Sequence, residues 1–215
     1  DYHDFVADAA ILLVCVKPAQ IAKVTETLRN AGLRPDTLLI SILAGVTTER
    51  LESLLDTANP WVRAMPNTPC IVGQGMTVVC GGRGVTADHL EQAQRIFASV
   101  GRCAVVEEHY CNAITALSGS GPAYCFVIIE ALADAGVQLG LGRDLAEKLA
   151  AQTMLGAARL CLQENQHPAR LKNMVTSPGG TTAAGLRVLE EGKIRATLTG
   201  AVEAAAKRAK ELAGS

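Results

Sequence analysis

The hydrophobic pattern of this 215-residue sequence changes character near His109. Ahead of that residue, short apolar runs alternate with helical patterns, and after it we find helical periodicity alone. Strands that alternate with helices are typical of an α/β layer with a mainly parallel sheet, whereas the second half predicts an all-α domain. We therefore expect an α/β domain over residues 1–108 and a helical domain over residues 109–215.

The first half predicts strands at residues 10–16, 37–43, 61–65, 75–80 and 103–106. The first run, AILLVCV, has no polar residue, which is typical of a strand buried on both faces. Thr47 or Thr48 is expected to cap one helix and Thr86 another, with Gly101 ending the second of them.

The helices expected at 123–139 and 145–162 are apolar on most faces. Glu130, Asp134 and Gln138 give the first of them only a narrow polar stripe. A lone bundle of about 100 residues cannot easily bury so much apolar surface within itself. We therefore expect the second half to form a subunit interface.

Composition and charge exclude several classes of protein. Hydrophobic residues make up 49% of the chain and charged residues 19%, which excludes intrinsic disorder. A net charge of −1 argues against a nucleic-acid or anionic-membrane partner, and no apolar run approaches the roughly 20 residues of a membrane span.

The seven cysteines form no CxxC, so we expect a reducing, cytoplasmic compartment. The four histidines are scattered, so we expect no metal site. Residues 1–4 carry no basic stretch of a signal peptide.

Three motifs come at the ends of predicted strands: VKP at 16–18, SILAGV at 41–46 and MPNTP at 65–69. Ligands bind at the carboxyl ends of strands in open α/β sheets, and small residues there admit a ligand to the backbone. The alternative for each motif is an ordinary strand stop or turn.

Two glycine motifs lie in the helical half. The glycines and proline of ALSGSGPAY, at 116–124, predict a kink where a flat ring could meet bare backbone. In SPGGTT, at 177–182, a glycine pair opens a helix with two hydroxyls in its first turn. Free amides at a helix start bind anions, although an ordinary N-cap is the alternative.

Taken together and in this order, VKP, SILAGV, RAMPNTP, ALSGSGPAY and VTSPGGTT resemble the Δ1-pyrroline-5-carboxylate reductases, the last enzymes of proline synthesis. The resemblance runs from about residue 7 to the C-terminus. It implies a Rossmann-like dinucleotide-binding domain followed by a helical domain that interlocks in a homodimer. Such dimers often associate further into decamers.

The resemblance also implies a reaction and its residues. A hydride passes from NADPH, or from NADH, to the C=N carbon of pyrroline-5-carboxylate, and L-proline is formed. Thr182 would hydrogen-bond the ring nitrogen as the catalytic residue. The remaining substrate-binding residues would be Ser177, Gly179, Gly180 and Thr181. The cofactor-binding residues would be Val16, Lys17, Pro18, Ala44, Gly45, Asn67 and Ser120.

One part of the family pattern is not found. The family's first strand leads into a Gly-rich GxGxxA turn, and no such turn precedes residues 16–18. We therefore expect the dinucleotide-binding domain to be N-terminally incomplete and this form to bind cofactor weakly, even to be inactive. The alternatives are a catalytically silent, oligomerising helical module and a different imine or hydroxyacid reductase. SPGGTT argues against the latter, because such relatives usually carry a catalytic lysine instead.

Overall fold

The computed structural model describes residues 2–164 and 166–213. It divides into two compact units, the first comprising the residues up to Pro122 together with those from Val202 onward, and the second residues 123–201. Asp1 and Ser215, which end the two expected domains, lie outside the described residues.

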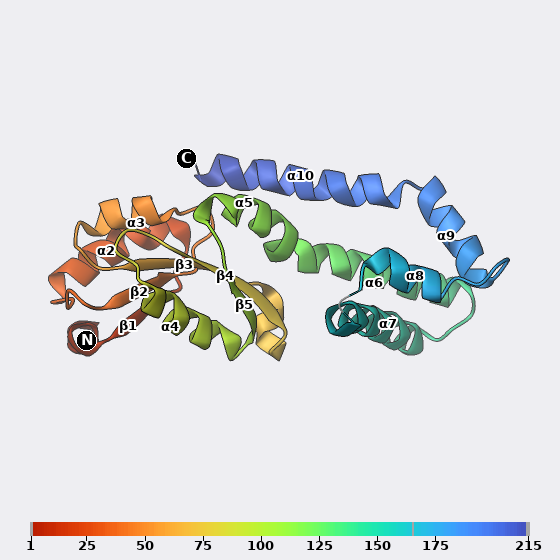
Figure 1. Cartoon of the computed structure of the whole chain (residues 1–215), viewed down its shortest axis with the longest axis horizontal. Helices are drawn as coiled ribbons and strands as arrows, with labels where there is room; N and C mark the ends of the chain where they lie inside the picture. The colour runs from red at the N-terminus through yellow and green to blue at the C-terminus, as the bar shows by residue number, and fades with distance from the viewer. Residues whose placement is uncertain (1, 165, 214–215) are drawn as a thin grey trace. The chain divides into compact units, whose positions relative to one another are not determined.

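The described part of the first unit is built around a five-stranded sheet with the order β1-β2-β3-β4-β5 (Figure 1). Each neighbouring pair is parallel except β3 and β4, so the expected mainly parallel sheet is confirmed. Its elements are α1 (Tyr2–Asp8), β1 (Ile11–Val14), α2 (Ile21–Asn30), β2 (Leu38–Ser41), α3 (Thr48–Leu55), β3 (Trp61–Met65), β4 (Gly75–Gly81), α4 (Ala87–Ala98), β5 (Gly101–Val105) and α5 (Cys111–Ile114). Short 3-10 or π turns are η1 (Pro18–Gln20), η2 (Thr68–Val72), η3 (Glu108–Tyr110) and η4 (Thr115–Gly119).

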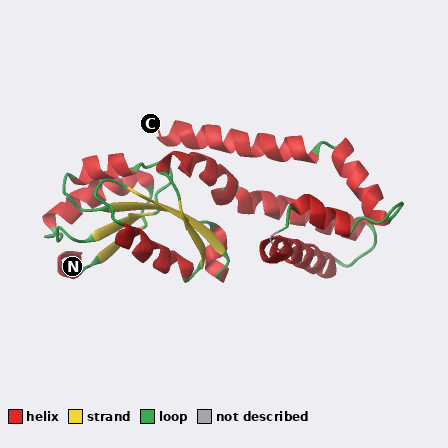
Figure 2. Cartoon of the chain, viewed as in Figure 1, coloured by secondary structure: helices red, strands yellow, loops and turns green. Residues whose placement is uncertain are grey.

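The core of this unit lies on both faces of the sheet, because successive side chains of a strand point to opposite faces. In β2, Leu39 packs on one side with residues of α2 and α3, whereas Leu38 and Ile40 pack on the other with Ala93 and Phe97 of α4. All four residues of β2 are buried. Figure 2 shows these helices in red on the two sides of the yellow strands.

Local chemistry sets the helix starts as expected. The Thr47 hydroxyl accepts a hydrogen bond from the Arg50 amide, and the Thr86 hydroxyl accepts one from the His89 amide. Gly101 was expected to end α4, and this is wrong: α4 ends at Ala98 and Gly101 is the first residue of β5. Gly101 has a φ of 152° and lies against the backbone of Gly75, so there is no room for a side chain at this position. Glycine here therefore allows β4 and β5 to pair.

The expectation for the first strand also needs correction. The apolar run predicted a strand buried on both faces, but β1 lies at the edge of the described sheet. Leu13 is 46% exposed, and only Val14 of this strand is fully buried. An apolar run indicates a strand but does not distinguish a central position from an edge.

Helices are the only regular secondary structure in the described residues of the second unit. It takes in most of α6 (Gly121–Gln138), α7 (Arg143–Glu164), α8 (Pro168–Met174), α9 (Thr181–Glu191) and the first part of α10 (Ile194–Ala213). Its buried core is small and centres on Ala133, Ala146 and Ala150. Large apolar side chains on α6 and α7 stay exposed within the chain, among them Phe126, Val127, Leu132, Leu145, Leu149 and Leu162.

The helical stretch Glu108–Gln138 is long and apolar enough to cross a membrane, judged by length and composition alone. Its most apolar window has a mean hydropathy of 1.4. The sequence expectation that nothing approaches a membrane span is therefore not upheld for this stretch. Only 11% of that window is buried within the chain, so its apolar surface still needs a covering partner.

Candidate active site

Residues Ser177–Gly180 form a tight turn that leads into α9. The Gly180 amide donates to the Ser177 carbonyl at 3.1 Å, and Gly179 has a φ of 67°, in the left-handed region that favours glycine. A Cβ at Gly180 would overlap Ser177 Oγ and press on the Ser177 carbonyl. The backbone therefore requires glycine at 179, whereas a side chain at 180 would push the Ser177 hydroxyl aside, and the turn presents bare main chain at the start of the helix.

The start of α9 is open in the way that an anion site requires. Gly180 is the N-cap, and no side chain caps the helix. The first amides of the helix, from residue 181 onward, have no intrahelical partner, and the helix dipole adds positive potential there. No acidic residue stands in the first turn, while Thr181 and Thr182 place two hydroxyls there. This end of α9 can hold a carboxylate.

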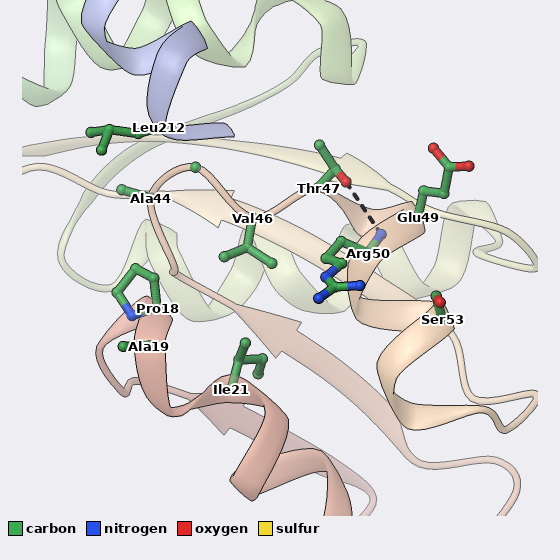
Figure 3. Close-up of a pocket in the computed structure, with 11 residues that line it drawn as sticks. Pro18, Ala19, Ile21, Ala44, Val46, Thr47, Glu49, Arg50, Ser53 and Leu212 are labelled. Atoms are coloured by element: carbon green, nitrogen blue, oxygen red, sulfur yellow. Dashed lines mark hydrogen bonds between the residues drawn. The ribbon is translucent and has the colours of Figure 1, made fainter. Parts of the chain in front are cut away.

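A separate cleft lies in the first unit, at the carboxyl ends of β1 and β2. It has a volume of about 770 Å³. Figure 3 shows Pro18 of η1 and Ile21 at the start of α2 facing Ala44 and Val46 of the loop after β2. Gly45, with a φ of 75°, shapes that loop. The full lining is Pro18, Ala19, Ile21, Ala44, Gly45, Val46, Thr47, Glu49, Arg50, Ser53 and Leu212.

The Asn67 side chain connects the loop after β3 to Met76 and Ser118. Its side-chain oxygen accepts from the Met76 amide at 2.8 Å, and its nitrogen donates to the Ser118 carbonyl and hydroxyl at 3.2 and 3.3 Å. In an α-helix the Ser118 carbonyl would accept from residue 122, but Pro122 has no N–H. The Ser118 carbonyl is therefore able to accept the hydrogen bond from the Asn67 side chain.

The expected kink in the glycine motif takes the form of the π turn η4. The Ser120 amide donates to the Thr115 carbonyl at 2.8 Å, five residues back. Such turns insert an extra residue into a helix and are frequent at functional sites.

The predicted cofactor-binding residues do not all line the same cleft. Pro18, Ala44 and Gly45 line one cleft, whereas Val16 lines a different depression beside α1 and α2. Lys17 forms a backbone turn with Gln20. All the proposed cofactor residues belong to the first unit, and all the proposed substrate residues to the second.

Within residues 2–164 and 166–213, no group of three His, Cys, Asp or Glu side chains could hold a metal ion.

Sequence reasoning missed a buried ionic network beside the cleft. The Glu108 carboxylate accepts from the Thr48 amide and hydroxyl at 2.9 and 2.6 Å, and from Arg63 Nη1 at 3.1 Å. Arg63 is 2% exposed, and its Nε and Nη2 have no hydrogen-bond partner. A charge inside the apolar strand WVRAM was the available signal, since a buried arginine requires a partner.

Comparison with known proteins agrees with the resemblance seen in the sequence. Residues 108–212 match the family model for pyrroline-5-carboxylate reductase dimerisation. The pyrroline-5-carboxylate reductase of Synechocystis sp. is 47% identical, over 94% of this chain and 74% of that protein. The chain belongs to the pyrroline-5-carboxylate reductase family.

Solved structures of pyrroline-5-carboxylate reductases share this fold. The Coxiella burnetii enzyme has a TM-score of 0.92 at 43% identity, covering 99% of this chain and 79% of its own. The Plasmodium falciparum pyrroline carboxylate reductase, solved with NADP bound, has a TM-score of 0.88 at 35% identity, covering 98% and 80%. The expected fold class, a Rossmann-like sheet domain followed by helices, is thereby confirmed. The chain spans about three quarters to four fifths of these pyrroline-5-carboxylate reductases.

Proposed function

We propose that the chain reduces Δ1-pyrroline-5-carboxylate to L-proline, the final step of proline biosynthesis. Membership of the family supports the reaction class. The observation that carries the proposal is the open start of α9 behind the Gly179-Gly180 turn, since the substrate is a cyclic imine with a carboxylate. The amides that begin at Thr181 bind that carboxylate with charge-assisted hydrogen bonds.

Thr182 is the proposed contact to the reacting end of the substrate. It stands in the first turn of α9, and its hydroxyl hydrogen-bonds no group within the described chain. When the imine arrives protonated, its nitrogen carries an N–H that the hydroxyl oxygen accepts, and the adjacent carbon is electrophilic. This contact fixes the ring orientation, and no general base is needed for the step.

NADPH is the proposed hydride donor, with NADH as the second choice; the relative with NADP bound supports the first. Bound in the first unit, the cofactor supplies the hydride. The cleft fits a flat ring because Pro18, Ala44 and Gly45 keep its walls small. Val16 and Lys17 after β1, Asn67 after β3 and Ser120 after the π turn remain proposed contacts of the cofactor.

A homodimer is the proposed working form, with assembly into decamers as a further step. The exposed apolar faces of α6 and α7 support this, because they lack cover within one chain. The dimerisation model that matches residues 108–212 covers the same helices. We assign the hydropathy of residues 108–138 to this interface, and the protein to the cytoplasm.

The test is product formation by the purified chain with pyrroline-5-carboxylate and NADPH deuterated at the transferable position. With NADPH at saturating concentration, so that weak cofactor binding does not limit the reaction, we expect L-proline with deuterium on the ring carbon that was double-bonded to nitrogen. Light scattering on the same sample should give at least a dimer. A dimer that binds no NADPH and makes no proline would overturn the enzyme proposal and favour the silent helical module. A stable monomer would overturn the dimer proposal alone.

A further inference from the structure

Two cysteines outside the candidate active site lie against each other in the first unit. Cys80 Sγ in β4 and Cys111 Sγ at the start of α5 are 3.6 Å apart. Both residues are 1% exposed and pack with Met65 and Val78. The two sulfurs are in van der Waals contact, so a small side-chain movement would bring them within bonding distance.

The two thiols are not equivalent. The hydrogen bond shared with Cys80 lowers the pKa of the Cys111 thiol, and the positive charge of Arg63 lowers it further against the effects of burial and Glu108. The same hydrogen bond and burial raise the pKa of the Cys80 thiol. Cys111 is therefore the better nucleophile, since the thiolate is the reactive form.

A small cleft lies beside the segment that carries Cys111. Arg63, Glu108 and Asn112 line this cleft of about 290 Å³, and Asn112 is the next residue in the chain. The cleft admits a molecule of the size of water or hydrogen peroxide. Because Cys111 does not line it and is 1% exposed, the oxidant reaches the sulfur only through a local movement at the start of α5, and the burial of both sulfurs excludes a protein thiol.

We propose that Cys80 and Cys111 form a peroxide-oxidisable dithiol that closes to a disulfide between β4 and α5. The Cys111 thiolate attacks one peroxide oxygen, the O–O bond breaks, and the departing hydroxide takes up a proton to become water. Cys111 is then a sulfenic acid. The Cys80 sulfur attacks the Cys111 sulfur, the S–S bond forms and the S–O bond breaks. The second hydroxide leaves with the Cys80 proton as water. Two thiols lose two electrons, and one peroxide becomes two waters.

The assignment differs from what exposure alone predicts. Cys15 and Cys125 are the exposed cysteines of the described chain, and unassisted oxidation would reach them first. A disulfide at Cys80–Cys111 requires the proximity seen here, because neither exposed cysteine has a neighbouring thiol within hydrogen-bonding distance in the described residues.

The test uses the whole chain, treated with hydrogen peroxide under native conditions, then alkylated in denaturant and digested without reduction. We expect a peptide linking Cys80 to Cys111 as the main cross-linked product, with the alkylatable thiols falling from seven to five. Oxidation confined to Cys15 and Cys125, or disulfides that join cysteines at random, would overturn the proposal.

A variant tests the order of attack. In Cys80→Ser the resolving thiol is lost while a hydrogen-bond donor to Cys111 is kept, so Cys111 should accumulate as a sulfenic acid that dimedone traps. Cys103→Ser, in β5, serves as the matched control and should still form the Cys80–Cys111 link. If dimedone labels Cys80 in Cys111→Ser but leaves Cys111 unlabelled in Cys80→Ser, the assigned order is wrong. The peptide map of the unmodified chain decides the disulfide itself even where a variant fails to fold.

Discussion

Glu108 accepts a hydrogen bond from Arg63, with Oε1 and Nη1 3.1 Å apart, and so links the start of η3 to the centre of β3. The same carboxylate holds the Thr48 amide and hydroxyl at the start of α3. One side chain thus joins three segments that are far apart in sequence, and it sits beside the loop that lines the 770 Å³ cleft.

Glu108→Gln should destabilise the chain. The amide keeps one acceptor oxygen but removes the charge that faces the buried Arg63 guanidinium. Removing one partner of a fully buried pair costs about 3–5 kcal/mol, and because the Glu108 side chain is 26% exposed we expect roughly 2 kcal/mol. Urea unfolding measures this. Glu107→Gln is the control: its side chain is 80% exposed, and its loss should change stability by less than about 0.5 kcal/mol. Equal shifts for both variants would contradict the role of Glu108.

Asn67→Asp should weaken the link between the loop after β3 and the π turn. The carboxylate still accepts from Met76, but it loses both donors to Ser118 and sets an anion against that carbonyl. An unpaired acceptor costs about 1–3 kcal/mol when it is buried, and because this contact is only part-buried we expect the lower end of that range. Gln74→Glu makes the same chemical change at an exposed position of the same loop and should leave the unfolding midpoint nearly unchanged. An Asn67→Asp variant as stable as wild type would show that the brace contributes nothing.

Gly180→Ala should impair substrate binding because its Cβ pushes the Ser177 hydroxyl aside and crowds the Ser177 carbonyl. We expect the KM for pyrroline-5-carboxylate to rise by roughly tenfold or more, as for loss of a charge-assisted hydrogen bond at about 1.5–3 kcal/mol. Gly185→Ala is the matched control, since a Cβ there meets no atom within 4 Å. If Gly185→Ala raises the KM as much as Gly180→Ala, helix propensity rather than the turn is responsible.

Thr182→Val keeps the shape and β-branching of the side chain and removes its hydroxyl. The loss of a hydrogen bond to a charged group should lower kcat/KM by about ten- to a hundredfold. Gly180 is the N-cap and no side chain caps α9, so the melting temperature should hardly change. A lower melting temperature with full kcat/KM would mean that the hydroxyl serves the helix rather than the substrate.

The features that the sequence predicted best are the helix caps and turns that depend on a few neighbouring residues. The Thr47 and Thr86 caps depend on residues three positions away, and the turn at Ser177–Gly180 depends on its own glycines. The contact between Arg63 and Glu108 joins residues 45 apart, and no local pattern contains it. For the same reason the apolar run of β1 could not show that Leu13 would be exposed, because the neighbours of a strand are set by topology.

The direction of β4 has a consequence for how the chain folds. β3 and β4 are antiparallel and are joined by residues 66–74 alone, whereas the parallel pairs of the described sheet each have a helix in their connection. Closing a short loop costs less entropy, so this hairpin can pair before α2, α3 and α4 dock. Val79→Ala in β4 should therefore slow refolding, while Leu12→Ala at the edge should mainly speed unfolding. The segment that carries Asn67 would take its shape early, ahead of the helices that later surround it.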